Sequence, residues 1–141
     1  MRNILLDTNA YAAFKRGEPG ATDIIRHAPL IGVNSVVLGE LYSGFAAGER
    51  DVENRQELKR FLDSPRVILL PITENTAEYY ARVYVDLRRK GRPIPTNDMW
   101  VAASALQHGL AVFTYDHHFG AVDGLIVGNS LVDLDEVSHY P

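Results

Sequence analysis

The sequence contains no cysteine among its 141 residues. Disulfide bonds, thiolate zinc sites and a cysteine nucleophile are therefore excluded, and a reducing compartment is permitted. A run of about 18 apolar residues is also lacking, and the apolar run at the N-terminus is too short for a signal peptide, so no membrane association is expected. We accordingly expect a soluble, cytoplasmic protein.

An excess of positive charge is lacking as well. The chain has 18 acidic and 14 basic residues, which gives a formal net charge of −4 and an isoelectric point near 5.7. Such a chain has no overall basic field to supply non-specific affinity for nucleic acid, so stable DNA binding by this chain alone is not expected. Transient contact with a nucleic-acid substrate is compatible with this charge. The sequence also lacks the GxxxxGK[ST], GxGxxG, GxSxG and HExxH motifs of other enzyme classes.

Short apolar runs alternate with helical segments along the chain. The runs predict strands at 4–6, 30–33, 67–70, 110–114 and 125–127, and helices are predicted at 10–15, 22–27, 36–47, 51–62, 77–90 and 97–107. Ser35 is the expected cap of the third helix. Because the strands are continuously apolar rather than alternating, they predict a parallel sheet covered by helices on both faces.

We therefore predict an α/β fold, a three-layer α/β/α sandwich with a mostly parallel central sheet. No repeat or linker composition interrupts the chain, so we expect one domain spanning residues 1–141. Its core is expected to cover about 3–128, and the polar C-terminal tail after it is expected to be peripheral.

Four acidic residues occupy positions that favour a common site. Asp7 and Asp116 follow predicted strands within two residues, at the sheet edge where sites form in parallel α/β proteins. Asp98 lies in the first turn of its predicted helix and on that helix's apolar stripe, so its carboxylate should point with the buried face. Glu40 is surrounded by apolar or small residues on its helix, where an unpaired charge is unfavourable.

Each of these acids has an ordinary structural explanation when taken alone, as a cap, a first-turn acid, a turn residue or an ion-pair partner. Gathered in one cleft, however, ionised carboxylates about 4 Å apart repel by roughly 4 kcal/mol per pair at an effective dielectric near 20. They then need a cation. An all-oxygen set of ligands without cysteine favours Mg²⁺ or Mn²⁺ over Zn²⁺.

The acids lie in four short motifs: DTN at 7–9, SVVLGEL around Glu40, IPTNDMWVAASAL around Asp98, and VFTYDHHF around Asp116. In order, spacing and context across residues 3–119, they resemble the successive motifs of the PIN-domain family, in particular the VapC-like toxins of toxin–antitoxin pairs. The resemblance implies a PIN-like sandwich and a Mg²⁺- or Mn²⁺-dependent endoribonuclease. It also implies a cognate antitoxin that occludes the site, and a homodimer.

The resemblance assigns all four acids to catalysis and metal binding. Asp7 and Asp98 would be the principal ligands, and Glu40 and Asp116 would bind the ion or orient water. The reaction would be hydrolysis of an RNA phosphodiester bond, with the metal lowering the pKa of a water and offsetting charge at phosphorus.

Neighbouring polar residues would support the site. Thr8 and Thr114 adjoin it, and Thr114 could donate a hydrogen bond within it. Asn9 and Asn97 each either cap a helix or orient a neighbouring carboxylate, and the preference of Asn for N-cap positions favours capping.

Basic residues near the end of the long predicted helix have two open interpretations, as a contact for the RNA backbone or as an ordinary solvated helix end. They are Arg88, Arg89, Lys90 and Arg92. We interpret His117 and His118 as exposed or as nucleic-acid contacts, because adjacent histidines rarely converge on one ion. Trp100, Tyr80 and Tyr84 are more typical of core or dimer contacts than of base stacking.

Two alternatives to a nuclease stay open. One is a non-catalytic PIN-fold protein that acts as a binding or regulatory module. The other is a metal-dependent phosphatase that acts on small phosphomonoesters. The presence of all four acids favours an enzyme.

Overall fold

The computed structural model describes residues 1–135. In this part of the chain the strands are β1 (Ile4–Leu6), β2 (Ile31–Asn34), β3 (Val67–Leu70), β4 (Ala111–Phe113) and β5 (Val127–Gly128). The α-helices are α1 (Thr8–Lys15), α2 (Pro19–His27), α3 (Ser35–Ala47), α4 (Asp51–Leu62), α5 (Glu74–Lys90), α6 (Thr96–His108) and α7 (Leu131–Leu134), and η1 (His117–Ala121) is a 3₁₀-helix.

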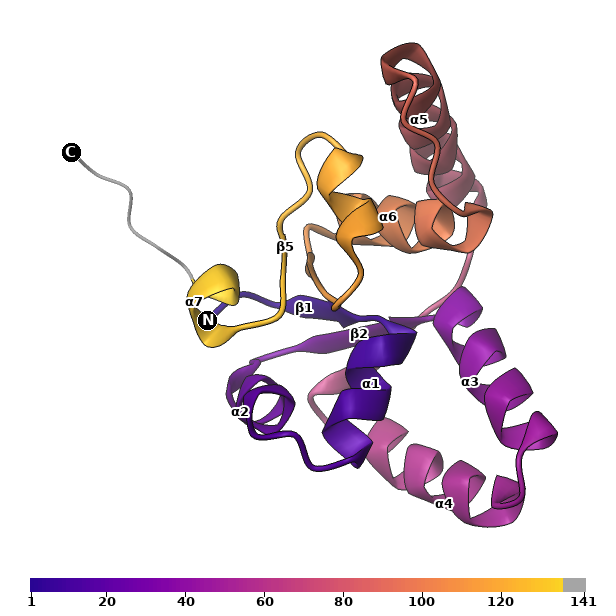
Figure 1. Ribbon diagram of the computed structural model, residues 1–141, viewed down its shortest axis with the longest axis vertical. Coiled ribbons are helices and arrows are strands. Elements are labelled where there is room, and N and C mark those ends of the chain that lie inside the picture. Colours follow the sequence, from indigo (N-terminus) through magenta and orange to yellow (C-terminus); the bar gives the residue numbers. More distant parts are fainter. Residues whose placement is uncertain (136–141) are drawn as a thin grey trace.

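The strands form one sheet in the order β3-β2-β1-β4-β5, and every neighbouring pair is parallel. Figure 1 shows α1, α2 and α4 on one side of β1 and β2, and α5 and α6 on the other. The predicted α/β/α sandwich is confirmed. Strands β2 and β3 lie on one side of β1, and β4 and β5 lie on the other. The strand order therefore reverses between β1 and β4, and their carboxyl ends flank a topological switch point.

Burial on both faces explains why the central strands are apolar throughout. All three residues of β1 are at most 1% exposed, and Val112 and Phe113 of β4 are fully buried. The edge strand β3 differs, because its two middle residues, Ile68 and Leu69, are 37% and 54% exposed. A continuous run of apolar residues is therefore a better sign of a central strand, buried on both faces, than of an edge strand such as β3.

The start of α3 corrects one prediction. Asn34, not Ser35, is the N-cap, and its Oδ1 accepts a hydrogen bond from the Val37 backbone N–H at 2.9 Å. The Asn34 side chain is fully buried, and its Nδ2 also donates to Ser104 Oγ at 3.1 Å. Asn34 thus caps α3 and ties it to α6, and Ser35 is the first residue of the helix.

For α5, the helical spacing of apolar residues in the sequence predicts an inner face made of Ala77, Tyr80, Ala81, Tyr84 and Leu87, and this prediction is only partly correct. Ala77, Ala81 and Tyr84 are exposed, whereas the buried residues are Thr76, Val83 and Leu87. The helix also begins earlier than predicted, at Glu74, and ends as predicted at Lys90, where Gly91 with a φ of 66° is the C-cap. The buried face differs from the predicted one because α5 packs mainly on α6.

Packing continues beyond the predicted core boundary at residue 128. Leu134 is fully buried, and its carbonyl accepts a hydrogen bond from the Arg2 backbone N–H at 3.0 Å. The last six residues of the predicted tail, 136–141, lie outside the described part. Within residues 1–135, none of the helices has the length and apolar character needed to cross a membrane.

Replacing Leu134 with Ala should lower the free energy of unfolding by about 2–4 kcal/mol, because it leaves a cavity where α7 packs on α2 and β5. The matched control is Val132→Ala in the same short helix, where the side chain is 80% exposed and the change should stay below about 0.5 kcal/mol. Urea unfolding followed by circular dichroism measures both. Equal effects for the two variants would contradict the packing of α7 described above.

Candidate active site

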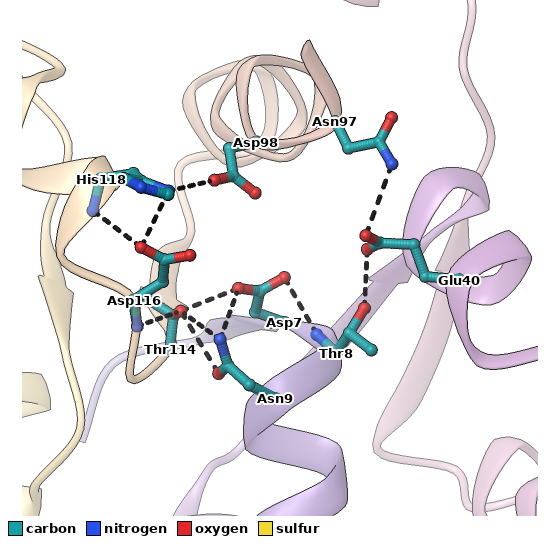
Figure 2. Close-up of polar contacts among 9 residues, drawn as sticks. All are labelled: Asp7, Thr8, Asn9, Glu40, Asn97, Asp98, Thr114, Asp116 and His118. Atoms are coloured by element: carbon teal, nitrogen blue, oxygen red, sulfur yellow. Dashed lines mark hydrogen bonds and ion pairs between the residues drawn. The ribbon is translucent and has the colours of Figure 1, made fainter. Parts of the chain in front are cut away.

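The four acids come from four separate elements at the carboxyl ends of the strands. Asp7 follows β1, Glu40 lies in α3, Asp98 lies in the first turn of α6, and Asp116 follows β4 and caps η1. Figure 2 shows their carboxylates facing a common space. The structure therefore brings together the four residues that the sequence singled out.

Asp7 is the most deeply buried of the acids, with 4% of its surface exposed. Its Oδ1 accepts a hydrogen bond from the Thr8 backbone N–H at 2.9 Å, which caps α1, and its Oδ2 accepts one from Thr114 Oγ1 at 2.8 Å. Burial raises the pKa of Asp7 from 3.8 to about 6, and the nearby charges of Asp98 and Glu40 add to this effect. The two hydrogen bonds oppose the rise without cancelling it.

Thr114 joins the ends of β1 and β4. Its hydroxyl donates to Asp7 and accepts from the Asp116 backbone N–H at 3.0 Å. Asn9 completes this connection, because its Oδ1 accepts from the Tyr115 backbone N–H at 3.0 Å and its Nδ2 lies 3.3 Å from Thr114 Oγ1. The orientation of Asp7 is thus fixed by residues that follow β1 and β4.

Glu40 is held by two side chains. Thr8 Oγ1 donates to Glu40 Oε1 at 2.7 Å, and Asn97 Nδ2 lies 3.4 Å from Oε2. The favoured interpretation of Asn9 and Asn97 as helix caps is wrong, since Asp7 caps α1 and Pro95 stands at the N-cap of α6. Asn97 instead contacts Glu40, and Asn9 contacts Thr114, which hydrogen-bonds to Asp7. The N-cap position lies two residues earlier in each case.

Asp98 and Asp116 share one histidine. His118 Nδ1 lies 2.9 Å from Asp98 Oδ2 and 2.9 Å from Asp116 Oδ1. Burial raises the pKa of Asp98, and Asp116 and Glu40 reinforce the rise, while His118 opposes it. The hydrogen bond to Asp98 raises the pKa of His118. The sequence interpretation of His118 missed this contact, and its only signal was the position two residues after Asp116.

These side chains fit a divalent cation. One ligand atom from each of Asp98, Asp116 and His118 lies within 4.8 Å of the others. Asp7 and Glu40 are close enough to these groups for their charges to raise the pKa values of Asp7 and Asp98. A cation would relieve this mutual repulsion, and the mainly carboxylate donor set suits a hard ion.

The basic end of α5 lies near the first turn of α6. The two helices are antiparallel, since Thr76 Oγ1 donates to Gln107 at 2.6 Å, while Arg88 lines a cavity of about 280 Å³ together with Met99. Lys90 differs from its basic neighbours because its ammonium group pairs with Asp86 at 3.0 Å and Asp123 at 2.5 Å. Lys90 therefore connects α5 to the segment after η1.

The aromatic residues make contacts within the chain. The rings of Tyr80 and Trp100 stack with centroids 4.0 Å apart, which joins α5 to α6. Tyr84 continues the stack at 6.5 Å from Tyr80 and is 42% exposed. The expectation of core contacts is thus confirmed for Tyr80, which packs against the core, while Trp100 is half-buried beside it.

Residues 4–125 match the PIN domain. Because this match covers most of the 141 residues, the chain belongs to the PIN-domain family. Among curated proteins, the chain is similar to ribonuclease VapC5 of Mycobacterium tuberculosis, with 30% identity over 120 residues that cover 85% of this chain and 87% of that protein.

Solved structures give the same result. VapBC-5 of Mycobacterium tuberculosis, a member of the VapBC family of toxin–antitoxin systems, has a TM-score of 0.71 and 27% identity, with 91% of this chain and 97% of that chain covered. DNA-bound VapBC from Salmonella typhimurium has a TM-score of 0.79 at 23% identity, covers 91% of this chain and 98% of that chain, and is similar in fold.

The raised pKa of Asp7 predicts a metal-free protein that loses stability as the pH rises. The folded state holds this proton more tightly than the unfolded state, so the free energy of unfolding should fall from pH 4 to pH 7. A rise from 3.8 to about 6 corresponds to roughly 3 kcal/mol as an upper bound. In EDTA at pH 7.5, Asp7→Asn should therefore be more stable than the unchanged protein by about 1–3 kcal/mol.

Urea unfolding at pH 5 and pH 7.5 measures this difference. The control is Asp63→Asn, which changes an exposed acid at the end of α4 and should alter stability by less than about 0.5 kcal/mol at either pH. An Asp7→Asn variant that is less stable at pH 7.5, with an unchanged dependence on pH, would contradict the account of Asp7.

Proposed function

We propose that this protein is a metal-dependent endoribonuclease and the toxin of a toxin–antitoxin pair. The observation that carries the proposal is the convergence of Asp7, Glu40, Asp98 and Asp116 from four elements around one space at the switch point of the sheet. The similarity to ribonuclease VapC5 supports the substrate class. All four acids are present and each accepts a hydrogen bond or ion pair that orients its carboxylate, which favours an enzyme over a non-catalytic module.

We propose that Asp98 and Asp116, together with Asp7, hold a Mg²⁺ or Mn²⁺ ion. When bound, this ion would acidify a water and offset the charge that develops on the phosphate. Asp7 is held in place by Thr8 and Thr114, so its carboxylate is oriented before substrate arrives. Such fixed orientation lowers the reorganisation needed during the reaction.

Glu40 is suited to a different role from the other acids. It is partly exposed, and Thr8 and Asn97 fix its two carboxylate oxygens. A carboxylate with this placement can accept the proton of a water that attacks phosphorus. We therefore assign Glu40 to proton transfer and water orientation.

The RNA backbone would be bound by the basic end of α5. Arg88, Arg89 and Arg92 are exposed, and Arg88 adjoins Met99, the residue after Asp98. These guanidinium groups can hold phosphates near an acidic site that would otherwise repel them. Lys90 is less available, because it is engaged by Asp86 and Asp123.

The toxin assignment implies further partners. A cognate antitoxin would inhibit the enzyme by placing a cationic or polar group among the four carboxylates. A homodimer and a cytoplasmic location complete the proposal, and the whole chain would form a single nuclease domain. The similarity to VapBC-5, which belongs to a family of toxin–antitoxin systems, supports the antitoxin.

Purified protein free of antitoxin should cleave structured RNA in Mg²⁺ or Mn²⁺ and should not cleave it in EDTA. Asp7→Asn and Asp98→Asn should each lower the cleavage rate by at least about a hundredfold, because each removes a charge that holds the ion. Asp63→Asn is the control and should cleave at the rate of the unchanged protein. Gel analysis of a panel of transfer, ribosomal and messenger RNAs measures this.

Metal-independent cleavage, or full activity in both site variants, would contradict the nuclease proposal. Cleavage of small phosphomonoesters with RNA left intact would instead identify a phosphatase.

Changing Arg88, Arg89 and Arg92 together to Gln should raise KM for RNA by about tenfold and leave kcat nearly unchanged, since these residues would contribute binding away from the reacting atoms. The dependence of binding on salt concentration should also become shallower. Lys90→Gln is the matched control and should change KM by less than about twofold while lowering thermal stability. An unchanged KM in the triple variant would exclude this surface as the RNA contact.

A further inference from the structure

The short helix η1 directs one of its two histidines into the acidic site. Asp116 caps η1, and its Oδ1 accepts a hydrogen bond from the His118 backbone N–H at 3.0 Å. Phe119, the next residue, is fully buried and anchors the turn. These contacts fix the backbone on both sides of the His118 Cα, so the ring is presented to Asp98 and Asp116.

The distances around His118 match those between ligands of one ion. Its Nδ1 lies 2.9 Å from Asp98 Oδ2 and 2.9 Å from Asp116 Oδ1. Adjacent ligands of an octahedral ion with bonds of about 2.1 Å are roughly 3.0 Å apart. The nitrogen and the two carboxylate oxygens could therefore hold one ion with little movement of the side chains.

Resting on the nuclease proposed above, we infer that His118 is a metal ligand, which coordinates through Nδ1 the same ion as Asp98 and Asp116. One nitrogen among oxygens changes the preference of the site. Imidazole suits transition metals, whereas Mg²⁺ strongly favours oxygen, so His118 makes the site prefer Mn²⁺ to Mg²⁺. The chain thus uses three acids and one histidine where a site of carboxylates alone would select Mg²⁺ more readily.

His117 provides a matched comparison within the same turn. It is exposed and directly precedes His118 in η1, whereas the ring that lies between the carboxylates of Asp98 and Asp116 in Figure 2 is that of His118. The proximity of two histidines to Asp116 in sequence is therefore not what makes His118 a ligand. The turn capped by Asp116 presents one ring to the site.

Pulsed electron paramagnetic resonance of the full chain loaded with Mn²⁺ tests this assignment without relying on activity. A directly bound imidazole nitrogen produces ¹⁴N modulation of the Mn²⁺ signal. The unchanged protein and His117→Asn should show this modulation, and His118→Asn should lose it. Asn keeps an amide donor near the position of Nδ1, but its nitrogen is a poor ligand. Labelling the histidines with ¹⁵N should replace the ¹⁴N pattern in the unchanged protein.

Calorimetric titration of the same three proteins gives a second measurement. His118→Asn should weaken Mn²⁺ binding by about tenfold and Mg²⁺ binding by less than about threefold, while His117→Asn should change neither. Circular dichroism verifies that each variant is folded.

The outcomes separate this inference from the proposed nuclease. If Mn²⁺ binds and RNA is cleaved but ¹⁴N modulation is absent, or persists in His118→Asn, then His118 is not a ligand and the nuclease stands. If neither ion binds the unchanged protein and RNA is not cleaved, both the inference and the proposed function are overturned.

Discussion

The repulsion among carboxylates at the carboxyl end of the sheet is the constraint on which the site depends. Burial and the neighbouring acids raise the pKa of Asp7 to about 6, and the same causes raise the pKa of Asp98. Folding therefore places acids where their charged forms are unfavourable. This arrangement lowers the stability of the metal-free protein, and a cation bound among the acids would relieve the repulsion. Raised pKa values among clustered acids are typical of functional sites and not of acids on an ordinary solvated surface.

The rest of the fold holds these acids against that repulsion. The sheet reverses its strand order at β1, which brings the residues that follow β1 and β4 side by side. Thr114 then joins Asp7 to the Asp116 backbone, and Thr8 reaches across to Glu40. Buried Asn34 fixes α3 against α6 through a hydrogen bond to Ser104. The two helices that carry Glu40 and Asp98 are therefore joined by a contact that does not involve the acids.

Much of this arrangement could be predicted from the sequence. Continuous apolar strands predicted the parallel sheet, and the position of Asp7 and Asp116 after two strands predicted that they would meet. The order of the strands was not needed to place both acids at the same edge of the sheet, because all carboxyl ends of a parallel sheet lie there. The PIN-like motifs add the order and spacing of the four acids.

The finer contacts could not be predicted because they depend on side chains meeting across distant segments. Asn9 and Asn97 have the composition of helix caps, yet the residues before them take those positions. The ring of His118 reaches Asp98 across 20 positions in sequence, and only the turn of η1 aims it there. The inner face of α5 was displaced for a similar reason, since its partner is α6 rather than the sheet.

The most direct test of the central claim is the fate of oxygen when RNA is cleaved in H₂¹⁸O with Mn²⁺. If the acidic site activates water to attack phosphorus, each new terminal phosphate should be a linear monoester that carries one ¹⁸O atom, and a 2′-deoxy substitution at the cleaved position should be tolerated. A 2′,3′-cyclic phosphate without ¹⁸O would show that the RNA's own 2′-hydroxyl is the nucleophile, and would contradict the account.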